Sequence, residues 1–266
     1  MADLGTQVEL ALLEQTLRKT MLAASGADLD RALRDLGWHD MLTELPDLAV
    51  PLVFRLLGET GAHAALLDDV IDHAAGRPLG GTPPLPFTGG AWLTWERTDR
   101  PGTTVDEQLP LHPSTGADQP GAAVAAGRRA LAWWLIGSSR AMLTLARRHA
   151  LQRSQFGRPV ASFQAVRHRL AETLVAIEGA EATLDVADSE FGALLAKAAA
   201  GRAAQLTARH CQQVLGGIGF TAEHDLHRHL RRTLVLDGLL GSARELVREA
   251  GHSLCAEGRA PRLAQL

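Results

Sequence analysis

Strong charge of one sign, cysteines with metal spacing and long apolar runs are all missing from this sequence. The 266 residues carry a formal net charge of −3 at pH 7, so no basic field points to nucleic acid. The two cysteines, Cys211 and Cys255, form neither a disulfide framework nor a metal-ligand pattern. No apolar run reaches about 18 residues, and no N-terminal segment has the layout of a signal peptide. We therefore expect a cytoplasmic protein that neither spans a membrane nor binds nucleic acid.

Aromatic residues and lysine are also scarce, and the composition indicates how the chain packs. Aromatic residues make up 4% of the sequence, whereas hydrophobic residues make up 46%, with alanine and leucine dominant. Both are strong helix formers, so the composition favours helix-on-helix packing over a sheet. Lysine occurs only as Lys19 and Lys197, which leaves 25 of the 27 basic residues as arginine. That bias is typical of GC-rich genomes.

Helical periodicity occurs on both sides of a segment rich in glycine and proline. An N-terminal helical segment, 1–76, has apolar spacing that predicts four helices, over 6–24, 27–37, 48–59 and 62–75. Residues 77–122 are dense in glycine and proline, and only 90–97 has a strand-like pattern, with a partner near 103–111. We expect a connector there with at most a short hairpin.

The remainder of the chain is predicted to form a bundle. Residues 123–257 have four or five helical stretches separated by short breaks, over 123–152, 160–187, 190–215, 222–236 and 241–256. A tail, 258–266, follows. Long antiparallel helices with short connections are typical of helical bundles.

Three ordered motifs place this bundle in a family. They are 153-RSQFGRPVASFQAVRHRLAE-172, 211-CQQVLGGIGFTAEHDLHRHLRR-232 and 230-LRRTLVLDGLLGSAREL-246. Their order and spacing resemble the C-terminal helical domain of acyl-CoA dehydrogenases, over about 121–257 and more faintly over the first 76 residues. The resemblance implies a mainly α fold: a helical bundle with a reduced, loop-rich remnant of the family's middle β domain.

The first motif carries groups suited to a phosphate-bearing ligand. The Arg153 guanidinium can donate a fork of hydrogen bonds to phosphate oxygens, and Gln155 can donate to the same oxygens. Phe156 can pack on a flat ring. Gln164 follows Arg153 by eleven residues, or three helical turns, and could face the same ligand. The alternative is that this motif binds no ligand and is only a helix-breaking turn followed by ordinary side-chain packing.

The second motif offers a helix end where bare backbone can approach a ligand, at Gln213, Gly216 and Gly217. In the family, positions of these two motifs grip the ADP portion of FAD, and they reach across to the flavin of a neighbouring subunit. The resemblance therefore implies a FAD shared with a partner subunit. The cofactor-binding residues that it implies are Arg153, Gln155, Phe156, Gln164, Gln213, Gly216 and Gly217.

Two parts of the family's active site are missing from the sequence. A barrel of seven or eight strands needs roughly 80 residues, and the 46 residues of 77–122 cannot build one. The family's catalytic glutamate aligns with Leu240, which cannot accept a proton. The alternative base position of some members aligns with Gly127. No catalytic residue is therefore expected, although Asp237, three residues before Leu240, could serve as a displaced base; its alternative role is to cap or end a helix.

Other polar clusters have simpler explanations. His224, His227 and His229, with His210 nearby, lack an i,i+4 pair and a matching carboxylate or thiolate set, so no metal site is expected. The basic residues Arg228, Arg231 and Arg232 form either a solvated or interface face, or a contact to a phosphate.

The leading hypothesis is half of a heteromeric enzyme. The partner would be a full-length acyl-CoA dehydrogenase-like subunit that supplies the β-barrel and the glutamate, in a heterodimer or heterotetramer of the kind found in actinobacteria. By analogy, the substrate would be a bulky acyl-CoA, with sterol side chains as one candidate. The alternatives are a flavin-free scaffold or regulator of the same fold, and a repurposed non-redox enzyme that uses Asp237 on a CoA thioester.

Overall fold

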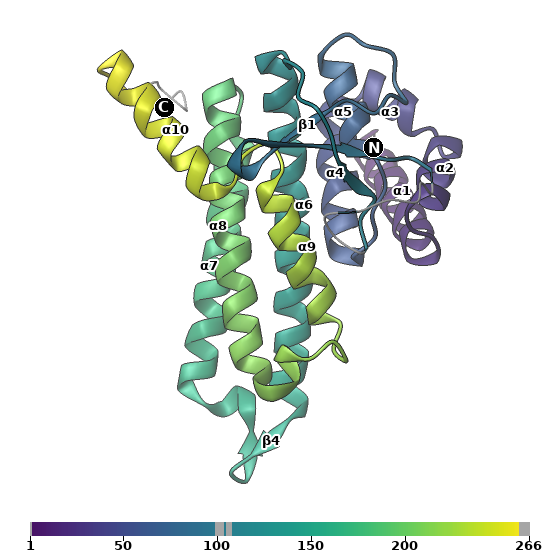
Figure 1. Ribbon diagram of the computed structural model, residues 1–266. Coiled ribbons are helices and arrows are strands. Elements are labelled where there is room, and N and C mark those ends of the chain that lie inside the picture. Colours follow the sequence, from purple (N-terminus) through teal and green to yellow (C-terminus); the bar gives the residue numbers. More distant parts are fainter. Residues whose placement is uncertain (1, 99–103, 105–107, 261–266) are drawn as a thin grey trace.

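The computed structural model describes residues 2–98, 104 and 108–260, with side chains from residue 7 onward. Two groups of helices make up most of these residues, and a small sheet lies beside them (Figure 1). The mainly α fold with a reduced sheet confirms the fold class predicted from the sequence. None of the described helices is long and apolar enough to cross a membrane.

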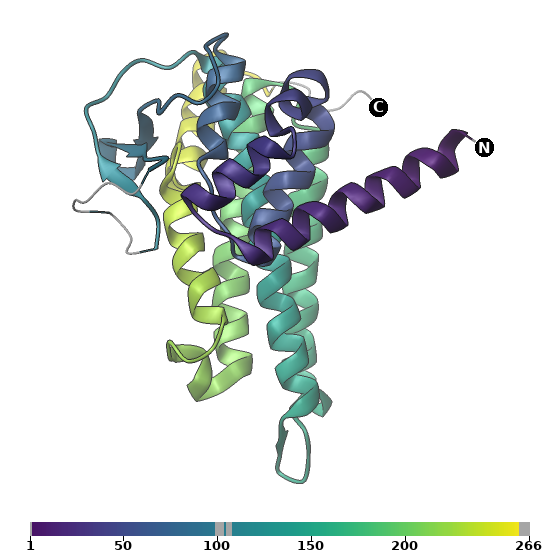
Figure 2. The ribbon, with the colours of Figure 1, turned by 90° about the vertical axis from the view of Figure 1, so that its right-hand side faces the viewer.

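The N-terminal group contains one helix more than the sequence predicted. Its members are α1 (Ala2–Ala23), α2 (Ala27–Asp35), α3 (Trp38–Glu44), α4 (Pro46–Thr60) and α5 (Leu66–Ala74). The extra helix is α3, which begins directly after Gly37, a residue in the left-handed conformation with φ 87°. Trp38 and Leu42 are buried and anchor this short helix. The first half of α1 projects away from the other helices (Figure 2), and Val8 and Leu12 are exposed there.

The connector forms a three-stranded antiparallel sheet in the order β1 (Leu85–Phe87), β2 (Ala91–Trp95) and β3 (Leu111–Pro113). This is one strand more than the hairpin expected. β2 falls within the predicted 90–97, and it pairs with 111–113, which overlaps the predicted partner segment at residue 111. Residues 103 and 105–107 lie outside the described part of the chain. A sheet of this size cannot close into a barrel.

The C-terminal bundle is built from helices that lie side by side, except that the last of them packs against one bundle helix and points away from the others (Figure 1). They are α6 (Gly121–Gln152), α7 (Gln164–Asp185), α8 (Glu190–Leu215), α9 (Leu226–Gly238) and α10 (Ala243–Glu257). Short elements join them: β4 (Ser154–Gln155), β5 (Arg158–Pro159), and the 3-10 turns η1 (Thr88–Gly90, in the sheet), η2 (Val160–Ser162) and η3 (Gly216–Phe220). The prediction for α8 agrees with the structure at both ends.

One hydrophobic core joins the two helical groups and the sheet. Trp134 of α6 stacks on Trp95 of β2, with ring centroids 5.7 Å apart, and meets the edge of Phe54 of α4. Helices α4 and α6 approach so closely that a Cβ on Gly58 or Gly137 would lie within 3.0 Å of the facing backbone. This close approach fixes the N-terminal helices against the bundle.

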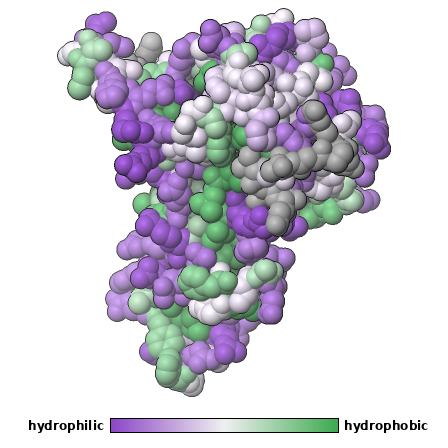
Figure 3. Space-filling view, in the orientation of Figure 1, coloured by the Kyte–Doolittle hydropathy of each residue, from purple (hydrophilic) through white to green (hydrophobic). Residues whose placement is uncertain are grey.

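The face of the molecule seen in Figure 3 has separate apolar and polar regions. Apolar residues show along the middle of the bundle and at its lower tip, while polar residues cover most of the outer helical surfaces. The exposed apolar residues of the tip include Phe156 and Phe220. A large exposed aromatic side chain is a common feature of contact surfaces.

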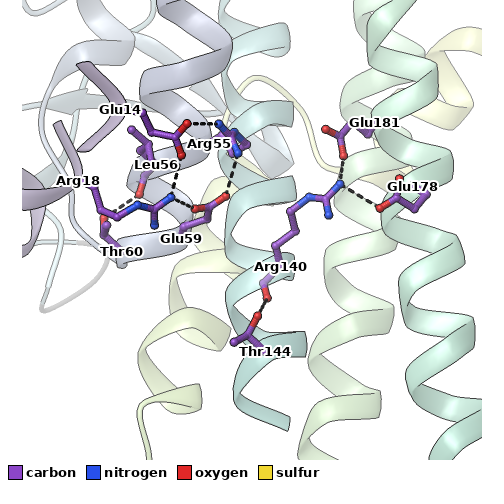
Figure 4. A network of polar contacts seen from close by, with 10 residues as sticks. All are labelled: Glu14, Arg18, Arg55, Leu56, Glu59, Thr60, Arg140, Thr144, Glu178 and Glu181. Atoms are coloured by element: carbon purple, nitrogen blue, oxygen red, sulfur yellow. Dashed lines mark hydrogen bonds and ion pairs between the residues drawn. The ribbon is translucent and has the colours of Figure 1, made fainter. Parts of the chain in front are cut away.

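Ion pairs on the outside of the helices add further links (Figure 4). Arg18 of α1 reaches Glu59 of α4 at 2.6 Å, and Arg55 of α4 also contacts Glu59. Arg140 of α6 binds both Glu178 and Glu181 of α7. These side chains are partly exposed, so each pair contributes little to stability on its own.

Candidate functional site

The first motif forms a small hairpin at the far tip of the bundle (Figure 1). Arg153 ends α6, and strands β4 and β5 pair Ser154 with Pro159 and Gln155 with Arg158. The tip holds Phe156 at φ 54°, a conformation that costs a non-glycine residue free energy. Its ring is 91% exposed and meets only the edge of Phe163, at a centroid distance of 6.1 Å.

The polar groups of this hairpin are available to a ligand. Arg153, Gln155 and Gln164 are all exposed. Within the described part of the chain, Arg153 and Gln155 make no side-chain hydrogen bond or ion pair. Gln164 lies at the start of α7, where its amide nitrogen is 3.4 Å from Nε2 of His168. The expected three-turn helical spacing from Arg153 to Gln164 is wrong, because the hairpin and η2 separate them.

The second motif lies at the same end of the bundle. Gln213 is exposed on the last turn of α8, and Gly216 ends that helix with φ 64°. A Cβ on Gly216 or Gly217 would meet no atom within 4 Å, so the backbone here faces open space. Ala150 of α6 and Val214 of α8 belong to one apolar cluster, which holds the two helix ends together. Both motifs are thus presented on one tip.

This tip is electropositive. Beside the hairpin, a cavity of about 340 Å³ is lined by Arg148, His149, Gln152 and His224, together with Leu145. Burial lowers the pKa of His149, and the neighbouring His224 and Arg153 lower it further. Cationic side chains near open backbone form an environment that suits phosphate oxygens.

Leu240, which the family resemblance predicts to stand at the glutamate's position, is buried in the turn between α9 and α10. It is 2% exposed and has φ 55°; Phe156 is the other described non-glycine residue with a positive φ. Its N–H donates to the carbonyl oxygen of Pro86 at 2.8 Å, and Arg128 Nε donates to its carbonyl oxygen at 3.1 Å. The turn is therefore fixed from both sides.

Gly127, which the resemblance predicts to stand at the alternative base position, faces the same leucine. A Cβ on Gly127 would lie 2.6 Å from Leu240 Cδ1 and 3.1 Å from Ile71 Cγ1. The two predicted positions converge in space although 113 residues separate them in sequence. Hydrocarbon occupies the volume between them, and neither position carries a carboxylate. The contribution of Ile71 was not predicted, because nothing in its local pattern distinguishes it from a core residue.

Two buried side chains, those of Asp237 and Lys197, make hydrogen bonds to this turn. The Asp237 carboxylate accepts from the Ala243 N–H at 3.1 Å and from Gln205 Nε2 at 2.8 Å, and the residue is 6% exposed. Lys197 is fully buried, and its Nζ donates to the carbonyl oxygens of Asp237 and Gly241. Burial lowers the pKa of Lys197 to about 8, although the charge of Asp237 opposes this shift. The role of Lys197 was not predicted. The sequence feature that could have indicated it is a lone lysine in an alanine-rich helix.

The histidine and arginine cluster on α9 is partly buried. His229 is 5% exposed, and burial together with Arg228 and Arg232 lowers its pKa to about 4. Arg232 is 4% exposed and donates to the carbonyl oxygen of Ala62 at 3.0 Å, so it anchors α9 to the N-terminal helices and is not a solvated residue. Within the described residues, no three His, Cys, Asp or Glu side chains are grouped to hold a metal ion.

The fold defines a class of protein: an acyl-CoA dehydrogenase-type helical domain with a small three-stranded sheet in the described part of the chain. The profile of the acyl-CoA dehydrogenase C-terminal domain matches residues 115–248, half of the chain. The chain therefore belongs to the acyl-CoA dehydrogenase family, as its three motifs predicted.

Several curated relatives come from mycobacteria. The acyl-CoA dehydrogenase IpdE2 of Mycobacterium tuberculosis is 34% identical over 178 residues, which cover 60% of this chain and 54% of that protein. The acyl-CoA dehydrogenase FadE34 of the same organism is 42% identical over 117 residues, 40% of this chain and 16% of that protein. The match thus spans about half of IpdE2 and a smaller part of FadE34.

Solved structures share the fold over nearly the whole chain. The ChsE4-ChsE5 complex from Mycobacterium tuberculosis has a chain with a TM-score of 0.66 and 18% identity, covering 95% of this chain and 98% of that one. The Tcur3481-Tcur3483 steroid ACAD G363A variant gives a TM-score of 0.65 and 20% identity, with 95% and 99% covered. At this identity the likeness shows the fold alone.

Proposed function

We propose that this chain is a non-catalytic subunit of a heteromeric FAD-dependent acyl-CoA dehydrogenase. The observation that carries the proposal is the buried contact among Leu240, Gly127 and Ile71. The family's two base positions meet there, and aliphatic side chains fill the space where a carboxylate would have to reach a substrate. Without a proton acceptor, α-proton abstraction cannot take place on this chain.

The chain's residues fit one end of FAD and not the other. Arg153 offers a free guanidinium for a diphosphate, Gln155 and Gln213 offer amides to orient it, and Gly216 and Gly217 leave room for close approach. A three-stranded sheet offers no cup for the isoalloxazine ring. When bound, FAD supplies the hydride acceptor of the dehydrogenation. The ring would therefore lie in a full-length acyl-CoA dehydrogenase-like partner, with the ADP end on this chain's tip.

The relatives support the choice of partner and substrate. Two solved neighbours are named as pairs of chains, ChsE4-ChsE5 and Tcur3481-Tcur3483, and the second is named a steroid ACAD. We extend this to a cytoplasmic complex, a heterodimer or heterotetramer, that acts on a bulky acyl-CoA such as a sterol side-chain thioester. Because the acyl site of this chain would be closed at Leu240, each pair of subunits would have one acyl site, in the partner.

Flavin content of the assembled complex tests the site. Coexpression with the partner subunit should give a yellow complex, and Arg153→Ala should lower its FAD occupancy at least tenfold at micromolar FAD, because a charge-assisted contact to phosphate is lost. Arg202→Ala is the matched control: Arg202 is exposed on α8, eleven residues before Gln213 and about 16 Å along the helix. Absorbance at the flavin band per mole of complex measures the occupancy.

The other outcomes separate the alternatives. Full flavin occupancy in the Arg153→Ala complex would show that the tip is not part of the cofactor site. Tight FAD binding by this chain alone would contradict a shared site. A stable complex without flavin would support a scaffold. Thioester turnover by the isolated chain that disappears in Asp237→Asn would support non-redox chemistry; the two bonds that the Asp237 carboxylate already makes argue against it.

A further inference from the structure

A second cavity, of about 470 Å³, lies between the two helical groups at the opposite end of α7 from the hairpin. Its volume is within the range of small-molecule sites, and a junction between helical groups is a common place for one. Part of the wall is apolar: Leu42 of α3, Val50 of α4, Val70 of α5 and Trp133 of α6 contribute to it. The 22 residues of α7 put it about 33 Å from the candidate FAD contacts.

The rim of this cavity is acidic. Three aspartates line the cavity: Asp185 at the end of α7, Asp188 just before α8, and Asp47 at the start of α4. All three are exposed, and in the described part of the chain none makes an ion pair or accepts a hydrogen bond. These carboxylates are therefore free to bind a cation.

Asp185 lies at an electrostatically unfavourable position. It is the last residue of α7, where the carbonyl ends of the helix already give a negative pole. A carboxylate at this position is destabilising unless a cation lies beside it. The nearest cationic lining residue, Arg129, donates from Nη1 to the carbonyl oxygen of Ala187 at 3.4 Å and forms no ion pair with Asp185 or Asp188.

We propose that this cavity binds an organic cation with an apolar body. With His73 counted as neutral, the lining carries three negative charges and one positive charge. A protonated or quaternary ammonium group would lie between Asp185 and Asp188 and offset their charge. The partly buried Trp133 ring offers a face for the cation or its apolar body. The ligand class is thus an amine or quaternary ammonium compound of drug-like size.

Titration of the full chain with benzyltrimethylammonium tests this site. The indole N–H signal of Trp133, assigned from its loss in Trp133→Leu, should shift saturably. Benzyl alcohol has the same ring without the charge and should bind at least tenfold more weakly, and benzoate should give no saturable shift. The affinity for the cation should also fall as salt is raised, since the rim is exposed. A linear shift, or equal binding of benzoate, would refute the proposal.

Paired variants locate the charge. Asp185→Asn with Asp188→Asn should weaken binding of benzyltrimethylammonium at least fivefold, while Asp28→Asn should leave it unchanged. Asp28 is a matched control because it is an exposed carboxylate elsewhere, 3.3 Å from Arg31 on α2. Unchanged affinity in the double variant would overturn the assignment. If that variant unfolds, the salt dependence and the benzoate comparison on the unaltered chain still decide. Neither outcome depends on FAD or on the partner subunit.

Discussion

At the scale of single residues, buried polar groups hold the turn around Leu240, between α9 and α10. Lys197 donates to two carbonyl oxygens of that turn and also lies near the Asp237 charge. Lys197→Ala would leave both carbonyls without their donor, isolate a buried carboxylate and open a cavity. We expect a loss of about 2–4 kcal/mol of unfolding free energy. Urea unfolding measures the loss.

The chain's other lysine provides the control. Lys19 is exposed on α1, so Lys19→Ala should change the unfolding free energy by less than about 0.5 kcal/mol. Equal, small effects of the two substitutions would show that the turn does not depend on Lys197. The sequence contained a trace of this role, because a lone lysine interrupts an alanine-rich helix, but its partners lie 40 and 44 residues away.

At the scale of elements, the closest helix crossing depends on two glycines. A Cβ on Gly58 would come within 3.0 Å of the Trp134 carbonyl oxygen, and one on Gly137 within 3.0 Å of the Arg55 carbonyl oxygen. Backbone atoms cannot yield as side chains do, so Gly58→Ala and Gly137→Ala should each destabilise by about 2–3 kcal/mol or more. Thermal unfolding should show a lower Tm for both.

Substitution of Gly251 should have the opposite effect on stability, although this glycine also lies in a helix. It lies in α10, and a Cβ added there would meet no atom within 4 Å, so Gly251→Ala should stabilise by about 0.5–1 kcal/mol through helix propensity. A similar Tm for all three variants would mean that α4 and α6 can separate without cost.

Sequence pattern predicted the elements unevenly, and the reasons are physical. The bounds of α8 were predicted because a long helical pattern closes at Gly216 and Gly217; in the structure Ser189 caps the start of this helix. α3 was missed because its seven residues are too few to show helical periodicity. At the candidate site, the motifs predicted the turn after α6 and the end of α8, but not that the turn forms a hairpin. The convergence of Gly127 on Leu240 required the packed fold, since no local pattern encodes a contact across 113 residues.

At the scale of the whole molecule, Arg97 fastens the sheet to the N-terminal helices. It follows β2 and donates to Asp30 of α2 at 2.9 Å, to Asp69 of α5 at 2.6 Å and to the Gly81 carbonyl oxygen at 2.9 Å. The guanidinium is 10% exposed and both carboxylates are buried. The charge of Arg97 also opposes the burial that raises the pKa of the nearby Asp68. One cation thus balances several buried acids.

Removing that cation should destabilise the fold in a pH-dependent way. Arg97→Ala removes the one cation that pairs with both Asp30 and Asp69, and it leaves Asp30 with Arg34 and Asp69 with His39. We expect a loss of about 3–5 kcal/mol at pH 7. Arg97 opposes the burial that raises the pKa of Asp68, so this pKa would rise further in the folded variant. The unfolded state then releases its proton first, and the stability of the variant falls as pH rises. The deficit relative to the unaltered chain should therefore shrink toward pH 4. Urea unfolding across this range, with the exposed Arg31→Ala as control, measures it; a deficit that grows toward pH 4 would show that the acids do not depend on Arg97.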